Sequence, residues 1–257
     1  MQSACNMIGN VRYVRRALIV FTLIAVAAFQ PAAGQSLTIK DLGALPGEFN
    51  YSNALGINER DQVIGYSITA GGNTHACLFE NGVVTDLGTL PGGSDSGALG
   101  INNRGQVVGY SSIAGGYAHA FLYEHGVMTD LGTLQGTNGS SHAQAINNRG
   151  QVIGISSTAS GDVHGFLFEN GLMTDLGTLP GRNDSNAFGI NNRGQVVGES
   201  DAGTNPYLPH AFLFEHGAMT DLGTLPGDNF SEGVGINEHG DIAGNSTLHA
   251  ILWTRKK

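Results

Sequence analysis

The chain of 257 residues combines 40 glycines with only 13% charged residues, and acidic residues outnumber basic ones by 21 to 12. A mean hydropathy of −0.04 favours a packed core over a disordered chain. An acidic surface repels phosphate backbones and anionic lipid heads, so we expect neither nucleic acid nor a membrane surface as a partner.

Residues 1–34 have the pattern of a secretory signal peptide. Arg12, Arg15 and Arg16 precede an unbroken apolar run over residues 17–29, and small residues end the segment before Gln35. This run is shorter than the roughly 20 residues that a membrane-spanning helix needs, and an uncleaved anchor is the alternative. Cleavage would leave a secreted, periplasmic or cell-surface protein without a membrane span. Its nine basic and 21 acidic residues give a net charge of −12.

The rest of the chain consists of five copies of one pattern. An Asp-Leu-Gly sequence recurs in it at nearly constant steps, beginning at Asp41, Asp86, Asp130, Asp175 and Asp221. An Ile-Asn pair and a histidine recur at matching places in every copy. A period in this range is typical of propellers, solenoids and repeat arrays.

Each copy has the pattern of four short strands joined by turns. In the second copy we expect strands over residues 98–102, 106–111, 119–124 and 127–134. The turn between the last two has two residues, which are Asn-Gly in other copies, and Asn-Gly favours the positive φ angles of a tight hairpin. Beyond residue 34, no apolar pattern with the period of a helix is long enough to predict one.

The spacings inside the copies distinguish two faces. The Ile of the first strand and the Gly of the second are equally far apart in all five copies, and the His and the next Asp are equally far apart in four. The other two connections vary in length from copy to copy. Because alternate loops of an antiparallel meander lie on the same side, the variable loops should share one face and the tight turns the other.

These elements predict an all-β fold, a five-bladed β-propeller with four-stranded blades, in one domain over residues 35–257. The last copy stops after its third strand, at Trp253, and residues 35–44 contain a fourth strand without the preceding three. We therefore expect this N-terminal strand to complete the last blade and cover its edge. An open β-solenoid is the alternative, but a solenoid would need distinct capping copies.

The His-Ala-Phe sequences at residues 119–121 and 210–212, together with the Asn-Asn-Arg-Gly-Gln-Val turns, resemble the HAF-repeat family of extracellular bacterial repeat proteins. Three copies depart by one letter, at Cys77, Gly165 and Ile251, and keep the histidine. The resemblance covers nearly all of the chain after the signal peptide. It implies an extracellular location and no particular reaction.

Three polar residues recur once per copy, and we interpret them as structural. The ligands of one metal ion must converge, whereas the repeat places each histidine in a different blade. Buried polar groups need partners, and a network of these residues would supply them. We expect no metal and no cofactor. The network would comprise His75, His119, His164, His210, His249, Ser52, Ser96, Ser141, Ser185, Ser231, Asp41, Asp86, Asp130, Asp175 and Asp221.

The variable-loop face is the expected binding surface, because loops on a rigid scaffold commonly carry recognition. The candidate ligand-binding residues are Phe49, Tyr51, Tyr117, Tyr207, Phe230 and Glu199. Tyr207 stands between two prolines in residues 200–209, which we expect to form a long, stiff loop. Ordinary packing of these aromatic side chains is the alternative. The function expected is an exported, non-catalytic monomer that binds a glycan or a protein.

A carbohydrate-active hydrolase is the alternative function. It would need two carboxylates at the mouth of the channel. The acidic residues in or beside the variable loops are Glu48, Asp95, Asp184, Glu199, Asp228 and Glu232. The spacing of the aspartates among them matches no calcium-binding loop.

Cys77 fills a position that is Phe in three other copies, so we expect a buried, unreactive thiol.

Overall fold

The computed structural model describes residues 37–136, 138–202 and 205–255, without the side chains of residues 202 and 205–207. Asp41–Lys257 form one compact unit. The predicted signal peptide lies outside the described residues. The described residues form strands and turns without a helix, so none of them belongs to a helix that could cross a membrane.

The 19 strands are grouped into five sheets, named here blades 1 to 5 in chain order. Blade 1 contains β1 (Ser52–Ile57), β2 (Val63–Ile68), β3 (Thr74–Glu80) and β4 (Val83–Asp86). Blade 2 contains β5 (Ser96–Ile101), β6 (Val107–Ser112), β7 (Ala118–Glu124) and β8 (Val127–Gly132). Blade 3 contains β9 (Ser141–Ile146), β10 (Val152–Ser157), β11 (Val163–Glu169) and β12 (Leu172–Asp175). Blade 4 contains β13 (Asp184–Ile190), β14 (Val196–Ala202), β15 (Asn205–Glu215) and β16 (Ala218–Asp221), and blade 5 contains β17 (Ser231–Ile236), β18 (Ile242–Ser246) and β19 (His249–Trp253).

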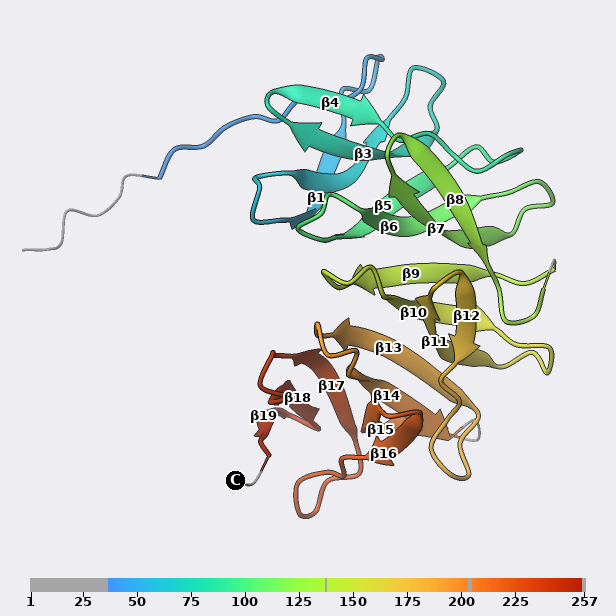
Figure 1. Ribbon diagram of the computed structural model, residues 1–257, viewed down its shortest axis with the longest axis vertical. Helices are drawn as coiled ribbons and strands as arrows, with labels where there is room; N and C mark the ends of the chain where they lie inside the picture. Colours follow the sequence, from blue (N-terminus) through green and yellow to red (C-terminus); the bar gives the residue numbers. More distant parts are fainter. Residues whose placement is uncertain (1–36, 137, 203–204, 256–257) are drawn as a thin grey trace, which may run out of the picture. The chain divides into compact units, whose positions relative to one another are not determined.

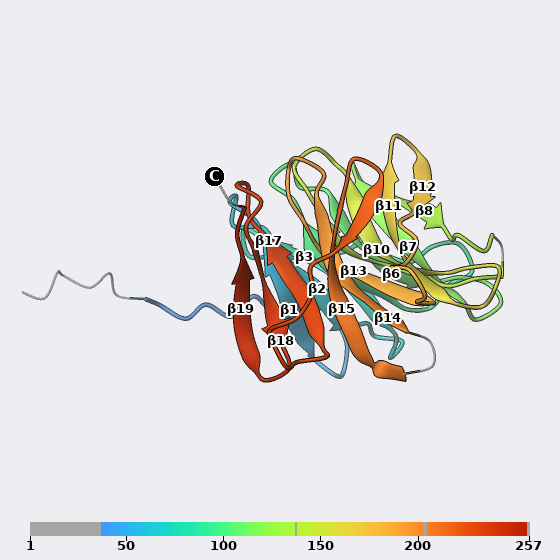
Figure 2. The same ribbon diagram turned by 90° about the horizontal axis from the view of Figure 1, so that it is seen from below.

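Every blade is an antiparallel meander in which strand order follows chain order. Figure 1 shows the blades following one another in sequence, from blade 1 at the top to blade 5 at the lower left. Seen from below in Figure 2, β17, β18 and β19 form one sheet at the side of the unit. The first strands of successive blades, β1, β5, β9, β13 and β17, contact one another. They therefore lie innermost.

A central cavity confirms that the blades surround one axis. Its volume is about 250 Å³, and equivalent residues at the ends of the first strands of all five blades line it. Among them are Glu59, Asn103, Asn148, Asn192 and Glu238. The predicted five-bladed propeller is therefore confirmed.

Local sequence explains the turns and the inner strands. The hairpin between β3 and β4 has φ of 52° at Asn81 and 80° at Gly82, and the other three complete blades have the same geometry. The second strand of each blade requires glycine. A Cβ atom at Gly109 would lie 1.9 Å from the carbonyl oxygen of Gly97, where the register between β5 and β6 shifts by one residue.

The hydrophobic core lies between neighbouring blades. Phe121, Phe166 and Phe212, one in each of blades 2 to 4, are fully buried. Cys77 occupies the equivalent position in blade 1 and is also fully buried, as predicted. Burial raises the pKa of its thiol to about 12, and the nearby Asp86 carboxylate adds to this increase. The thiol is therefore protonated and shielded at neutral pH.

One prediction about the ends of the chain is not met. The last blade has three strands, and residues 37–44 form none, while residues 35 and 36 lie outside the described residues. The polar contacts that hold the Asp41–Gly43 turn go to blade 1 instead: Ser52 Oγ donates to the Gly43 carbonyl oxygen at 2.7 Å. Leu42 packs beside the Leu45, Cys77 and Phe79 cluster of the same blade.

The stiff loop predicted over residues 200–209 is also different in the structure. β14 continues to Ala202 and β15 begins at Asn205, and these two residues pair across the hairpin. The extra residues of this copy therefore lie in a hairpin whose register shifts between Ser200 and Ala202, where β15 has more residues than β14.

Candidate functional site

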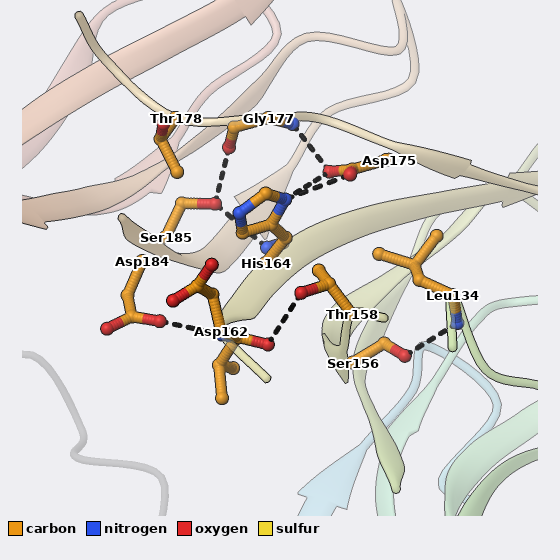
Figure 3. A network of polar contacts seen from close by, with 12 residues as sticks. Leu134, Ser156, Thr158, Asp162, His164, Asp175, Gly177, Thr178, Asp184 and Ser185 are labelled. Atoms are coloured by element: carbon orange, nitrogen blue, oxygen red, sulfur yellow. Dashed lines mark hydrogen bonds and ion pairs between the residues drawn. The ribbon is translucent and has the colours of Figure 1, made fainter. Parts of the chain in front are cut away.

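The recurrent histidine, aspartate and serine meet at each boundary between neighbouring blades, which we call a seam. In the seam between blades 3 and 4, His164 Nδ1 donates to the Asp175 carboxylate at 2.9 Å. Asp175 also accepts from the Gly177 amide, and Ser185 Oγ of blade 4 donates to the Gly177 carbonyl oxygen at 2.6 Å. The Gly165 amide donates to Ser185 Oγ and completes the cycle. Figure 3 shows the bonds that join His164, Asp175, Gly177 and Ser185.

The same cycle forms in the other three seams of neighbouring blades. Its histidine–aspartate pairs are His75–Asp86, His119–Asp130 and His210–Asp221, each at 2.9 Å. Its serines are Ser96, Ser141 and Ser231, each of which joins a glycine carbonyl of the preceding blade to a backbone amide of its third strand. Among the described residues, three predicted network members lie outside these four cycles: His249, Asp41 and Ser52. Ser52 Oγ still donates to the Gly43 carbonyl oxygen, as the other serines do to their glycines.

A second set of seam contacts, at the tight-turn end of the blades, was not predicted. Asn102 Nδ2 of blade 2 donates to the Asn147 carbonyl oxygen of blade 3 at 2.9 Å. Asn103, one residue later, donates its backbone amide to Asn148 Oδ1 at 2.8 Å. Equivalent pairs join blades 1 and 2, 3 and 4, and 4 and 5. The recurrence of Asn after each Ile is the sequence signal for these contacts.

The opposite, variable-loop end of the inner strands carries a different residue pair in each blade. Five cross-strand pairs, one between the first two strands of each blade, form what we call the polar layer. The layer consists of Asn53 and Tyr66, Gly97 and Tyr110, His142 and Ile155, Asn186 and Glu199, and Glu232 and Asn245. It contains amide, phenol, imidazole and carboxyl groups where the seams have repeated residues.

Two interactions connect the polar layer from one blade to the next. The Tyr110 ring of blade 2 stacks on the His142 ring of blade 3, with centroids 4.9 Å apart. Burial lowers the pKa of His142, so its imidazole is neutral at pH 7. In blade 4, burial raises the pKa of Glu199, a hydrogen bond from Asn186 Nδ2 opposes that shift, and the carboxylates of Glu232 and Asp201 add to it.

A cavity of about 200 Å³ opens at the variable-loop end of blade 3. His142 and Ile155 of the polar layer line it together with Val163 and four serines. At the position of Ile155, the other blades carry Tyr66, Tyr110, Glu199 and Asn245. The cavity therefore lies where the repeat is broken by a side chain without polar atoms.

The aromatic residues predicted to bind ligand are spread over several blades. Phe49 and Tyr51 are exposed beside blade 1, and the Tyr51 ring lies 6.2 Å from that of Tyr66. Tyr117 is exposed in the loop before β7, and Phe230 is half-buried before β17. These residues form no single cluster among the described side chains. The Tyr207 side chain lies outside the described residues, so its role stays a prediction.

Most acidic residues of the variable loops have structural partners. Asp95 accepts from the Thr74 amide at 2.9 Å, and Asp184 from the Val163 amide at 2.6 Å, each across a seam. Asp228 accepts from Ser246 Oγ at 2.7 Å. Glu48 is exposed. Within the described part of the chain, no group of three or more His, Cys, Asp or Glu side chains could hold a metal ion.

No protein-family model and no curated protein sequence matches the chain. The β-propeller domain of the Trilobed protease from Pyrococcus furiosus is 13% identical to this chain, with a TM-score of 0.48 over 67% of this chain and 52% of that one. TolB from Acinetobacter baumannii is 14% identical, with a TM-score of 0.48 over 76% of this chain and 52% of that one. The chain thus spans about half the length of both proteins (52%). Neither similarity assigns a function to it.

Proposed function

We propose that this propeller is an exported, non-catalytic module that binds a glycan or a protein through its variable-loop face. Repeated and variable residues of the propeller make different contacts, and this difference supports the proposal. In the four seams, the recurrent residues are occupied by contacts between blades, whereas the polar layer differs in each blade. A site that recognises an asymmetric ligand needs different groups around it, and a scaffold needs repeated ones.

The cavity beside His142 is the observation that carries the proposal. Its volume of about 200 Å³ suits one ring-sized group, and Ile155 and Val163 give it an apolar wall. The neutral imidazole of His142 has one donor and one acceptor nitrogen, and either could bond to a ligand hydroxyl or amide. A sugar ring or a single amino-acid side chain would match both features, because each combines an apolar face with polar edges.

A glycan array tests this site. The fluorescently labelled protein should bind a subset of the immobilised glycans, and Ile155→Trp, which fills the cavity, should remove that binding. Tyr66→Trp is the matched control, since it enlarges the equivalent position of blade 1 away from the cavity and should leave binding intact. Unchanged binding by Ile155→Trp, with a melting temperature equal to wild type, would place the ligand elsewhere.

Export is the second part of the proposal. The basic and apolar pattern of residues 1–34 and the resemblance to the HAF-repeat family both support it. Expression in a bacterial host followed by N-terminal sequencing of the exported protein should give a mature chain that begins at Gln35. Protein that stays in the membrane fraction and still carries residues 1–34 would indicate an anchor instead.

One observation favours the alternative of a carbohydrate-active hydrolase. Glu199 and Glu232 belong to adjacent blades, and burial, with a smaller contribution from Glu232, raises the pKa of Glu199, as a general acid requires. A panel of chromogenic glycosides distinguishes the two functions. Turnover that Glu199→Gln and Glu232→Gln both abolish would establish the enzyme, and turnover by neither wild type nor variants is the result expected for a binding module.

A further inference from the structure

The four seams between consecutive blades use one set of contacts, but blades 5 and 1 share none of them. Among the described residues no hydrogen bond or strand pair joins blade 5 to blade 1. The groups that would form such a seam are nevertheless in place. Ser52 of blade 1 and the backbone amide of Ala250 in blade 5 are equivalent to Ser96 and Ala76, which are bonded at 2.8 Å between blades 1 and 2.

The tight-turn end shows the same incomplete set. Asn237 of blade 5 is equivalent to Asn102, which donates across its seam to a backbone carbonyl. Asn237 Nδ2 bonds at 3.1 Å to Asp241 in its own turn, as Asn102 Nδ2 does to Gln106. Among the described residues it has no counterpart of the bond that Asn102 makes across the seam. The Glu59 side chain of blade 1 occupies the position of Asn103 and Asn148, which accept a backbone amide from the preceding blade. Blade 1 therefore offers an acceptor, and blade 5 offers a donor.

Burial shows that the two faces are shaped to be covered. Ala98, Ala143 and Ala187 are completely buried by the preceding blade, whereas the equivalent Ala54 of blade 1 is exposed. In blade 5, Leu252 is 64% exposed, whereas the equivalent Leu213 of blade 4 is 9% exposed. Apolar side chains that the other blades bury wholly or in part are exposed to water on these two faces.

We propose that the uncovered faces of blades 1 and 5 bind each other within one chain and form a fifth seam. The occupant is the same chain because Glu59 and Glu238 already line one central cavity together with residues of the other blades. The new seam would contain three hydrogen bonds that repeat those of its four equivalents. The Ala250 amide donates to Ser52 Oγ, Asn237 Nδ2 to the Asn58 carbonyl oxygen, and the Glu238 amide to the Glu59 carboxylate.

Formation of this seam has a consequence for the polar layer. In the layer, the second-strand residue of one blade faces the first-strand residue of the next, as Tyr110 faces His142. The fifth seam brings Asn245 of blade 5 toward Asn53 of blade 1 and makes the layer continuous around the axis. The inference concerns the assembly of the unit and does not depend on the proposed ligand binding.

Disulfide trapping tests the seam in the full chain. Glu59→Cys and Glu238→Cys are introduced together into a Cys5→Ser background, where the buried Cys77 should not react. The control pair is Glu59→Cys with Asn103→Cys, because the Glu59 amide lies 3.0 Å from Asn103 Oδ1 in an existing seam. Such contacts bring the Cα atoms near the roughly 4.4–6.8 Å range of a disulfide.

Both pairs should form an intramolecular disulfide under mild oxidation, seen as a monomer by non-reducing electrophoresis and as a loss of two hydrogens by intact mass. Free thiols in the seam pair, with a complete disulfide in the control pair, would overturn the proposal. A disulfide-linked dimer would also overturn it, because the occupant would then be a second copy of the chain.

A single substitution tests the fifth seam independently, without introduced cysteines. Ala54→Arg leaves an open face undisturbed, since Ala54 is exposed, but it obstructs a closed seam. We therefore expect it to lower the melting temperature in the same direction as Ala98→Arg, the matched change in the buried seam between blades 1 and 2. A melting temperature equal to wild type for Ala54→Arg, beside a clear decrease for Ala98→Arg, would contradict closure.

Discussion

The two ends of the inner strands differ in how they use polar residues. At the tight-turn end, Asn58, Asn102, Asn147 and Asn191 make the same bond to the next blade at the same distance of 2.9 Å. At the variable-loop end, the polar layer presents a different pair in every blade. Both ends belong to the same strands, so the difference does not come from the fold.

Residues that bridge two blades must be the same in every repeat, whereas residues of the polar layer can differ between repeats. A residue that bridges two blades is constrained by both, because its loss leaves a buried donor or acceptor without a partner. A residue of the polar layer faces a partner that varies, or a cavity, and its chemistry can change without breaking a seam. Function is therefore expected where the repeat is interrupted, as at His142, Ile155 and Glu199.

The largest effect should follow deletion of residues 35–44. The deletion removes Leu42 from the cluster around Leu45 and removes the Gly43 carbonyl oxygen that accepts from Ser52. It would expose the cluster of Leu45, Cys77 and Phe79 in blade 1 to water. We expect the truncated protein to unfold or aggregate, as measured by thermal melting and size-exclusion chromatography. A monomer with the melting temperature of the parent protein would show that this segment does not support blade 1.

Asn147→Ala should have the next largest effect. Its amide donates to Gln151 Oε1 and to the Asn191 carbonyl oxygen, and its Oδ1 accepts from the Arg149 and Gln151 amides. Truncation leaves several of these buried groups unpaired, and we expect a loss of about 2–4 kcal/mol in the free energy of unfolding. Urea denaturation measures it. Asn103→Ala is the control, because Asn103 is exposed, with an expected loss of about 1 kcal/mol or less. Equal losses for the two variants would contradict a larger contribution from the buried Asn147.

The fold could be predicted because the same residue types recur in the five repeats wherever the same local geometry is needed. The glycine after each His or Asn in the hairpins requires positive φ, and Gly109 leaves room for a carbonyl oxygen. Such requirements are local, and they appear directly as sequence patterns. The burial of Cys77 could be predicted for the same reason, since its equivalents are large and apolar.

The candidate site could be predicted only in part, because it is made of departures from the pattern. Glu199 stands out in the sequence as a break in the repeat, whereas nothing at His142 or Ile155 suggests that a cavity lies beside them. Tyr51 and Tyr117 are candidates by their chemistry alone, and only spatial neighbours can decide whether such rings converge. The recurrent Asn is a signal for the tight-turn contacts of Asn102, but its acceptor is a backbone carbonyl one repeat away, and no residue type identifies a backbone acceptor in the sequence.

The smallest effect is expected from two carboxyl groups on the variable-loop side, those of Asp95 and Glu199. Their contributions to the stability of the fold should change with pH in opposite directions. The bond from the Ser94 hydroxyl and that from the Thr74 amide lower the pKa of Asp95, whereas burial raises the pKa of Glu199. A lowered pKa contributes stability above the unfolded-state pKa that is lost as pH falls through the folded-state value. A raised pKa works in the opposite direction, since stability falls as pH rises from the unfolded-state to the folded-state pKa.

Asp95→Asn and Glu199→Gln should therefore shift the melting temperature with opposite signs at pH 7. Asp95→Asn should melt below wild type, and the difference should shrink toward pH 3, where the wild-type carboxyl is losing its charge. Glu199→Gln retains an oxygen for the Asn186 bond and should melt at or above wild type at pH 7, with no advantage at low pH. A Glu199→Gln protein that melts well below wild type at pH 7 would make Glu199 part of the scaffold. Opposite signs would instead show that ionised Asp95 stabilises a seam, whereas the buried carboxyl of Glu199 destabilises the fold. Such a carboxyl in the polar layer could serve a ligand or a substrate.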